Sequence, residues 1–122
     1  MFEPRVAAAS LSGESDAAWA RRLAPHVGAA FLGGICLDEA TRDAAAAMVA
    51  DRDRDEFLPA DPAAFVETEL DALADVPVLP CVNVRSATIG PVQEAGRICA
   101  KQGALLEINA HCRQDELRAA GC

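Results

Sequence analysis

Short apolar runs alternate with amphipathic or alanine-rich segments along the whole chain, and this alternation restricts the possible folds more than any other feature of the sequence. Each apolar run is too short for a typical core helix and is typical of a buried strand. Strands are therefore expected at residues 6–11, 29–36, 77–84 and 104–109. Because helical segments separate them, these strands are expected to pair in parallel through right-handed crossovers, which predicts an α/β domain.

The boundaries of the helices are marked by capping residues. Asp16, Asp38 and Asp61 stand where a helix N-cap is expected, and Pro62 follows at the first helical position of its segment. A fourth helix is expected to begin at Pro91 and to stop at Gly103. The mixed-charge run at residues 51–56 is expected to be a solvated loop or helix end.

Two architectures fit this pattern, an open doubly wound sheet and part of a closed barrel, and periodicity alone does not separate them. A (β/α)₈ barrel has eight strands and about 250 residues. The 122 residues of this chain provide only four expected strands. If the fold is a barrel, residues 1–122 are expected to form one partial domain with the C-terminal half absent.

The chain carries 19 acidic and 11 basic residues, which gives a formal net charge of −8. Such a charge disfavours binding to the phosphate backbone of DNA or RNA. An alternative is adaptation of a halophilic proteome to high salt, in which case charge reflects solubility more than partner choice. No apolar run approaches the roughly 18 residues of a membrane span, and no secretory signal is recognisable at the start. A cytoplasmic protein without a membrane partner is expected.

The five cysteines are odd in number and widely spaced, so a disulfide framework is not expected and most of them are expected to be core residues. There is no C-x-x-C pair, and a tetrahedral zinc site has little support. Gly33-Gly34 belongs to neither of the common nucleotide-binding glycine motifs.

In either architecture, functional groups gather where strands end and loops begin. The segment after the fourth expected strand brings an amide, an imidazole and a thiol together within four positions, at Asn109, His111 and Cys112. A thiol with a pKa of about 8.5 is mostly protonated at neutral pH unless nearby cations, here His111 and Arg113, lower that pKa. Cys112 can therefore be an acid or a nucleophile. Alternatively it is a packing residue, and Asn109 satisfies local backbone groups.

Two segments resemble the dihydrouridine synthases, flavin-dependent barrels that reduce the 5,6 double bond of uracil rings in transfer RNA. Residues 9–16 occupy the place of the family pattern A-P-M-A-G-V-T-D, with Ser10 in place of proline and Trp19 as the following aromatic residue. Residues 109–113 resemble the pattern N-x-G-C-P, in which Asn109 and Cys112 match while His111 and Arg113 depart. Residues 107–114, which contain this second segment, are similar in sequence to an archaeal branch of related barrels that is described as like dihydropyrimidine dehydrogenases.

This resemblance implies the N-terminal half of a (β/α)₈ barrel and FMN as cofactor. It implies that reduced FMN passes a hydride to C6 of the pyrimidine while Cys112, as general acid, protonates C5. It also implies two sets of binding residues. The flavin would contact Ala9, Ser10, Leu11 and Asn83, and the substrate would contact Asn109, His111 and Arg113. Asn83 is preferred to Cys81 at the place of the family's strand-three glutamine, because an amide can replace an amide.

The substrate stays open between a tRNA uridine and a free pyrimidine, and the acidic balance of the chain disfavours tRNA. A barrel relative without redox activity, acting as a binding or scaffold protein, is the competing hypothesis. Pairing of two copies into a barrel, as a homo-oligomer, is a further alternative, in which each exposed sheet edge has to be covered.

Overall fold

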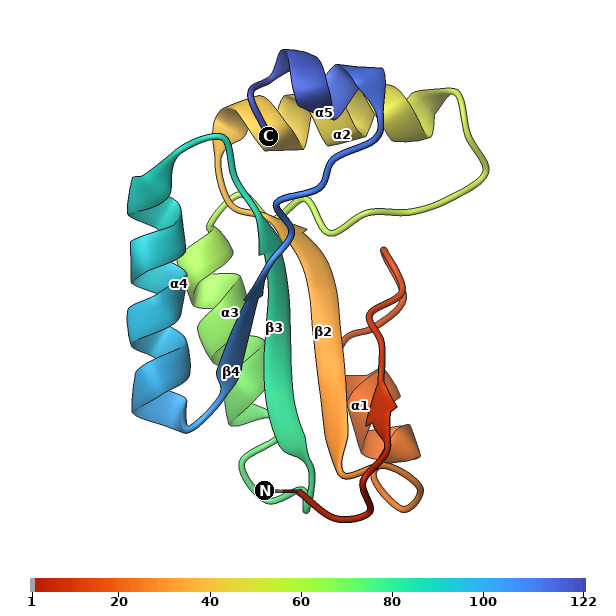
Figure 1. The fold of residues 1–122 in the computed structure, drawn as a ribbon, viewed down its shortest axis with the longest axis vertical. Helices are drawn as coiled ribbons and strands as arrows, with labels where there is room; N and C mark the ends of the chain where they lie inside the picture. The colour runs from red at the N-terminus through yellow and green to blue at the C-terminus, as the bar shows by residue number, and fades with distance from the viewer. Residues whose placement is uncertain (1) are drawn as a thin grey trace.

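A computed structural model describes residues 2–122 of the chain, and strands and helices alternate along it (Figure 1). The strands are β1 (Ala7–Ala8), β2 (Ala29–Cys36), β3 (Leu79–Arg85) and β4 (Leu105–Ile108). The helices are α1 (Ala17–Leu23), α2 (Glu39–Ala50), α3 (Pro62–Asp71), α4 (Ile89–Gln102) and α5 (Asp115–Ala119). The α/β class predicted from the alternation is confirmed.

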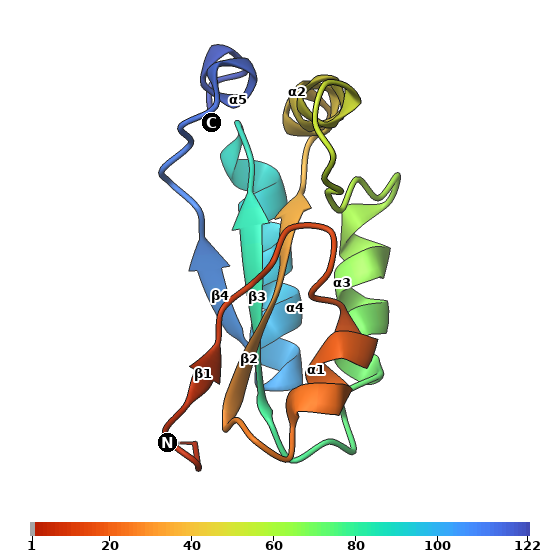
Figure 2. The same cartoon turned by 90° about the vertical axis from the view of Figure 1, so that its right-hand side faces the viewer.

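The four strands form one sheet in which every pairing is parallel and the spatial order is β1-β2-β3-β4. Figure 2 shows α1, α3 and α4 on one face of this sheet, with the edge strands β1 and β4 displaced toward the other face. A doubly wound sheet reverses its strand order and carries helices on both faces. Sequential order with helices on one face is instead the arrangement of half a (β/α)₈ barrel.

Three helices begin at the aspartates expected to cap them. The side chains of Asp16, Asp38 and Asp61 accept hydrogen bonds from the backbone N–H groups of residues 19, 41 and 64. Each bond satisfies one of the N–H groups that the first helical turn leaves without a partner. Helix α4 ends at Gly103, whose φ of 68° is the left-handed conformation that glycine adopts most easily.

The main core lies between the sheet and the three helices that cover it. Leu32, Val82 and Val84 are almost fully buried and pack with Val66 of α3 and Ile98 of α4. Each fully buried aliphatic side chain contributes about 1.5–3 kcal/mol through the hydrophobic effect. Cys36, Cys81 and Cys99 are also buried, which confirms the expectation that most cysteines are core residues.

A second, smaller apolar cluster lies beyond the ends of the strands, where α2 and α5 pack together (Figure 1). It contains Cys36, Ala45, Met48 and Leu117. Helix α5 was not expected from the sequence, because its five residues are too short to show a periodic pattern. It draws the end of the chain back over α2.

The first strand is shorter than the sequence indicated. Residues 6–11 were expected to form it, but only Ala7 and Ala8 pair with β2. Farther along β2, Ser15 occupies the edge, because Gly33 N–H donates to the Ser15 carbonyl and Ser15 Oγ donates to the Gly33 carbonyl. Within residues 2–122, no helix is long and apolar enough to cross a membrane.

Candidate functional site

A pocket of about 190 Å³ lies on the face of the sheet that the helices leave open. Alternate residues of a strand point to the same face of a sheet, so this face carries one residue in two from each strand. The lining comes from segments that are far apart in the sequence, namely Ala7, Ala9, Ser10, Phe31, Asn83 and Glu107. The pocket is therefore a product of the parallel pairing.

The polar wall of the pocket is a hydrogen-bonded pair between neighbouring strands. Asn83 of β3 and Glu107 of β4 stand opposite each other in the register. Asn83 Nδ2 donates to Glu107 Oε2 at 2.8 Å. Asn83 is buried while Glu107 is exposed, so the carboxylate orients the amide and keeps an oxygen for a ligand. This wall offers both donor and acceptor groups to a polar ring.

Glycine at position 34 makes room for the polar residues of β3. The paired register of β2 and β3 shifts between Leu32 and Ile35, around Gly33 and Gly34. A Cβ atom at Gly34 would stand 2.8 Å from Asn83 Oδ1 and 3.0 Å from Arg85 Nη2. A larger residue would displace both side chains, so Gly34 brings the amide and the guanidinium close to the strand backbone.

Arg85 is a buried cation on the same face of β3 as Asn83, and only 7% of its surface is exposed. Among residues 2–122, its Nε has no hydrogen-bond partner, and no carboxylate lies within ion-pair distance of its guanidinium. Burial of an unpaired charge is costly unless another group compensates it. Arg85 therefore leaves a positive charge beside the pocket, next to Asn83.

Asp38 joins the loops at the carboxyl ends of β2 and β3. Its Oδ1 accepts from the Thr41 N–H and hydroxyl, and its Oδ2 accepts from the Ser86 and Thr88 hydroxyls and from the backbone N–H groups of Ala87 and Thr88. Burial alone would raise the pKa of Asp38, but the hydrogen bonds together hold that pKa well below its ordinary value. Asp38 is thus a fixed structural anion.

Three of the four residues expected to contact a flavin, Ala9, Ser10 and Asn83, line the pocket. Leu11 does not line it. The Leu11 side chain is 55% exposed, its N–H donates to Ser15 Oγ, and its carbonyl accepts from the N–H groups of Glu14 and Ser15. Leu11 therefore belongs to the turn that leads into α1.

The residues expected to contact substrate lie in the segment after β4, and none of them lines the pocket. Asn109 is half-buried, and its Oδ1 accepts from the His111 N–H. His111 and Arg113 are exposed, and Arg113 Nε donates to His111 Nε2 at 3.0 Å. The hydrogen bonds of these three side chains are therefore local to the segment, with the Asn109 amide on the His111 backbone and the Arg113 guanidinium on the His111 ring.

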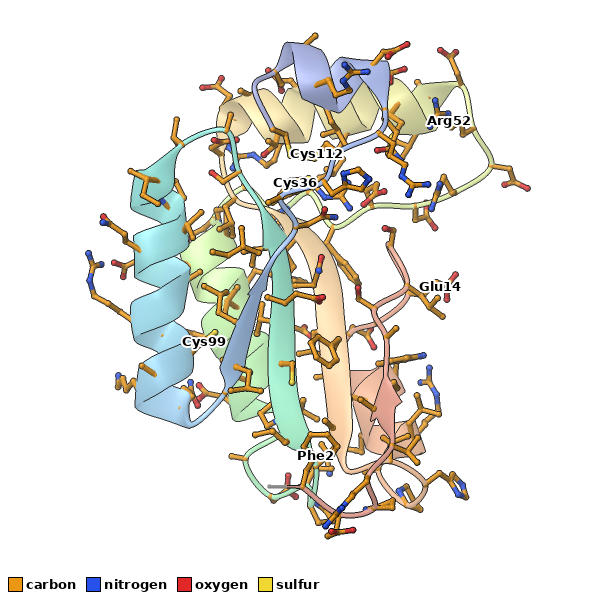
Figure 3. The ribbon with its side chains drawn as sticks, in the orientation of Figure 1. Phe2, Glu14, Cys36, Arg52, Cys99 and Cys112 are labelled. Atoms are coloured by element: carbon orange, nitrogen blue, oxygen red, sulfur yellow. A yellow bond between two sulfur atoms is a disulfide. The ribbon has the colours of Figure 1, made fainter. Side chains whose placement is uncertain are left out.

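Cys112, the expected general acid, is joined to Cys122 by a disulfide (Figure 3). This bond was not expected from the sequence, because the spacing alone gave no reason to pair the two residues. They meet because α5 turns the chain back, so that Cys112 and Cys122 both pack against the cluster of α2. A disulfide has no thiol proton, so Cys112 is not a proton donor in this state.

Sequence reasoning missed Glu107 as a site residue. The available signal was a carboxylate inside an otherwise apolar strand, at a position that alternation places on the same face as Leu105. Its pairing with Asn83 depends on the register between β3 and β4, which the sequence does not reveal. Two apolar lining residues, Ala7 and Phe31, were also not identified from the sequence.

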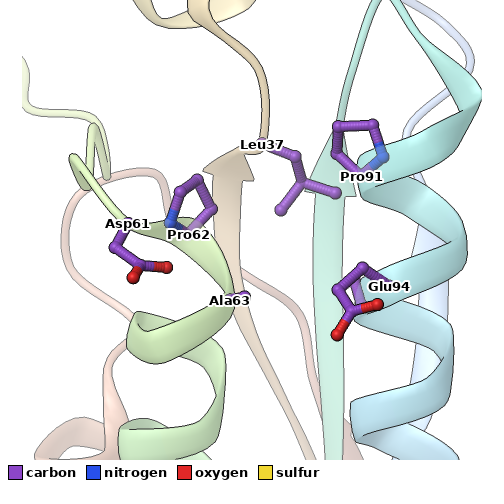
Figure 4. A pocket seen from close by; sticks show the side chains of 7 residues that line it. Leu37, Asp61, Pro62, Ala63, Pro91 and Glu94 are labelled. Carbon is purple, nitrogen blue, oxygen red and sulfur yellow. The ribbon is translucent and has the colours of Figure 1, made fainter.

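A second pocket, of about 140 Å³, lies on the helix side between the first turns of α3 and α4 (Figure 4). Its lining is mostly apolar, and the two polar side chains in it are the carboxylates of Asp61 and Glu94. Helix N-termini attract anions through free N–H groups, but Pro62 and Pro91 have none and Asp61 already caps α3. This pocket offers little to an anionic ligand.

Comparison of the chain with protein-family models, with curated proteins and with solved structures found no match.

Proposed function

We propose that this chain forms the flavin-facing part of an FMN-dependent oxidoreductase that reduces the 5,6 double bond of a uracil-type ring. One observation carries the proposal: Ala9, Ser10 and Asn83, expected from separate sequence segments to contact a flavin, line one pocket. That pocket lies on the open face of the sheet, which would be the interior of a barrel. Concave pockets with a few polar groups in an apolar lining are where small ligands usually bind.

The chemistry of the pocket supports one edge of a flavin ring as its ligand. Flavin and uracil rings both carry a cyclic imide, in which an N–H stands between two carbonyl groups. The Asn83 amide, with a second N–H, can donate to such a carbonyl, and the Glu107 carboxylate can accept from the imide N–H. Reduced FMN, when bound, would supply the hydride.

Few of the described residues could bind the phosphate of FMN. Phosphate sites in such barrels usually come from the loops after strands seven and eight. The sheet described here has four strands. The buried cation next to the pocket is Arg85, which lies two residues after Asn83 and on the same face of β3. We therefore expect the chain alone to bind FMN weakly, mostly through the ring.

Proton donation by Cys112 requires reduction of its bond to Cys122. A dithiol reductant would convert that disulfide to two thiols and be oxidised to its own disulfide, with two electrons and two protons passing to the protein. The Cys112 thiol could then protonate C5 of the pyrimidine as the hydride reaches C6. Activity is therefore proposed for the reduced chain, after movement of the segment that carries Cys112.

A free pyrimidine is the favoured substrate within this class. The net charge of −8 repels a polynucleotide, whereas a neutral uracil ring carries no charge that the protein would repel. A second candidate function is a barrel-type binding protein without redox activity. The disulfide at Cys112 favours that candidate, because the expected acid is then an element of structure.

Titration of protein into FMN, followed by quenching of flavin fluorescence, tests the flavin site directly. Asn83→Leu is expected to weaken FMN binding about tenfold, because the amide that faces the imide is lost. Gln93→Leu removes an amide from the exposed surface of α4 and is the matched control, expected to bind FMN as the unmodified chain does. Equal affinity of the two variants, or absence of quenching by the unmodified protein, would move the assignment to the non-redox candidate.

Uracil reduction is then measured in single turnovers with FMN that has been photochemically reduced beforehand, with and without a dithiol reductant for the Cys112–Cys122 bond. Turnover that requires the reductant, and that Cys112→Ser abolishes while FMN affinity stays unchanged, is the expected result. Unchanged turnover in Cys112→Ser would remove the general-acid role from this residue while leaving the flavin site intact.

A further inference from the structure

Four of the five large apolar side chains that are exposed among residues 2–122 lie in or next to the two edge strands of the sheet. Val6 and Leu11, on either side of β1, are 52% and 55% exposed, and Leu105 and Ile108 of β4 are 51% and 55% exposed. Among residues 2–122, one other large apolar side chain is comparably exposed, Ile89 at the start of α4. Apolar surface concentrated in one region of a protein marks a contact with another surface.

The same two strands have unpaired backbone edges. In the described part of the chain, residues 2–122, strand β1 pairs only with β2, and β4 pairs only with β3. An open edge presents N–H and C=O groups to any strand that can pair with it. Because all pairings in the sheet are parallel, β4 of one molecule can extend in parallel along β1 of another.

We infer that the open face and both edges of this sheet bind a second copy of this chain, so that two sheets close into one eight-stranded barrel. The contact is two-fold symmetric: β4 of each copy pairs with β1 of the other. Closed two-fold pairing of this kind is the commonest form of protein oligomer, and it leaves no edge exposed.

The observed register determines which residues would meet. The paired segment moves toward the carboxyl end of the strands from one edge of the sheet to the other. Strand β1 pairs with the first residues of β2, Ala29–Ala30, and β4 pairs with later residues of β3, Cys81–Val84. A barrel of eight strands has a shear of eight, which amounts to a stagger of about four residues across each half. In the single sheet Leu105 is level with Cys81 and Phe31, and therefore with position 9 of the chain if β1 is extended. A stagger of about four residues moves the level on the second copy from position 9 to Arg5, which would stand opposite Leu105, and its Ala7 would stand opposite Glu107.

This register brings complementary groups together. Val6 of the second copy would lie beside Leu106 and Ile108 on the helix side, which covers two of the exposed apolar side chains. Arg5 of the second copy would lie on the same face as Glu107, within reach of its carboxylate. Both charges are exposed in the single chain, and within residues 2–122 the one ion pair of Arg5 is with Glu3. Opposite charges at both contacts favour the symmetric pair over random association.

The pocket on the open face becomes complete only in this pair. Glu107 of one copy would stand next to Ala7 of the other, so β1 of the second copy would form the wall that the single chain lacks. Two equivalent pockets result, each walled by both copies. Pairing of the two copies depends on the sheet edges and their register and does not require a ligand.

Sedimentation equilibrium over a wide concentration range tests the pair. The unmodified chain is expected at twice its 12.8 kDa mass, and Ile108→Lys is expected at the single mass, because a charge would face the new strand pairing. Ile89→Lys makes the same change at an exposed apolar side chain away from the edges and is expected to remain paired. Far-ultraviolet circular dichroism reports whether each variant is folded.

An exchange of the two charges between Glu107 and Arg5 tests the register. It also tests the pairing itself if Ile108→Lys fails to fold. Glu107→Arg and Arg5→Glu are each expected to raise the dissociation constant about tenfold, and the double variant is expected to restore it. A single-chain mass for the unmodified protein at every concentration, equal dissociation by Ile89→Lys and Ile108→Lys, or no restoration in the double variant would overturn the inference. Masses beyond two copies would also overturn it, since open chains do not close a barrel.

Discussion

Asp38 shows how one side chain can hold several loops in place. It caps α2 through Thr41 and at the same time binds the loop between β3 and α4 through Ser86 and Thr88. Those two loops leave the sheet from the carboxyl ends of the neighbouring strands β2 and β3. The carboxylate therefore links the start of α2 to the start of α4 and restricts the movement of both.

Asp38→Asn is expected to lower the free energy of unfolding by about 2 kcal/mol at about pH 7, because hydrogen bonds to a charged acceptor are replaced by weaker ones. Since the folded pKa of Asp38 is depressed, its contribution is complete above the unfolded value of 3.8 and is lost as the pH falls below that value. The stability difference between the variant and the unmodified chain should therefore narrow in acid. Urea denaturation at several pH values measures it.

Asp61→Asn is the matched control for this measurement. Asp61 caps α3 through one backbone hydrogen bond, and asparagine caps a helix about as well as aspartate. We expect almost no change in stability at any pH. A loss equal to that of Asp38→Asn would mean that the additional bonds of Asp38 contribute nothing.

The buried thiols are expected to be unreactive in the folded chain. Burial raises the pKa of the Cys36 and Cys81 thiols to about 11, and it also raises that of Cys99. At about pH 8 these groups are therefore almost entirely protonated, and the thiolate is the reactive form. A thiol-specific chromogenic reagent should react slowly with the native protein and with the three free cysteines once it is denatured. Rapid reaction with native protein would show that Cys112 and Cys122 are free thiols.

Individual residues were predictable where the signal is local. Asp16, Asp38 and Asp61 were identified as caps because a cap acts on residues two or three positions away. The remaining bonds of Asp38, the Asn83–Glu107 pair and the meeting of Cys112 with Cys122 join positions that only the folded chain brings together. Local sequence patterns do not show which distant positions the fold brings into contact.

At the scale of elements, α5 depends on contacts outside itself. A helix of five residues has almost no stability alone. Leu117 is fully buried against α2, and the disulfide joins residues on either side of the helix, ten positions apart. Helix α5 is therefore expected to be the first element to lose its structure when that bond is reduced.

Reduction of Cys112–Cys122 is expected to increase hydrogen exchange in α5 while α4 stays protected. Closing a loop of this length contributes about 2–3 kcal/mol in the chain-entropy account of disulfides. Hydrogen exchange followed by mass spectrometry, with and without a dithiol, measures the change for each segment. Cys122→Ser should reproduce the reduced pattern without reductant. Equal loss of protection in α4 would instead mean that α5 unfolds together with the whole sheet.

Elements with strong local signals were predicted well, and those set by tertiary contacts were not. Strand β2 has its expected bounds because its apolar run is continuous. Strand β1 was expected to be longer, because nothing in its sequence indicates that Ser15 takes the edge of β2 at Gly33. Helix α4 begins at Ile89, two residues before the proline that was expected to open it.

At the scale of the whole molecule, the net charge is expected to make the stability of the fold depend on salt concentration. The net charge is −8, and the acidic side chains repel one another more strongly in the compact folded state than in the unfolded chain. This repulsion lowers the free energy of unfolding. Increasing NaCl from about 0.05 M to about 1 M shortens the screening length to about 3 Å. The midpoint of thermal unfolding should then rise by roughly 5 °C, which corresponds to about 1 kcal/mol for a domain of this size.

A variant with fewer charges provides the control. Asp53 and Asp55 lie in the exposed loop between α2 and α3, and their replacement by asparagine removes two of the negative charges without changing the core. This double variant should start from a higher midpoint at low salt and gain less from added NaCl. The same gain in both proteins would assign the salt effect to stronger burial of apolar groups rather than to screening.

Placing all three sheet-covering helices on one face gives the two faces of the sheet different tolerance to mutation. On the covered face, any change of volume disturbs a packed core, so few substitutions are compatible with folding. On the open face, Ser10, Asn83 and Glu107 contribute little to that core, and they can change without loss of the fold. A chain built this way can acquire a new ligand preference through a few substitutions on one side of the sheet, while the other side preserves the scaffold.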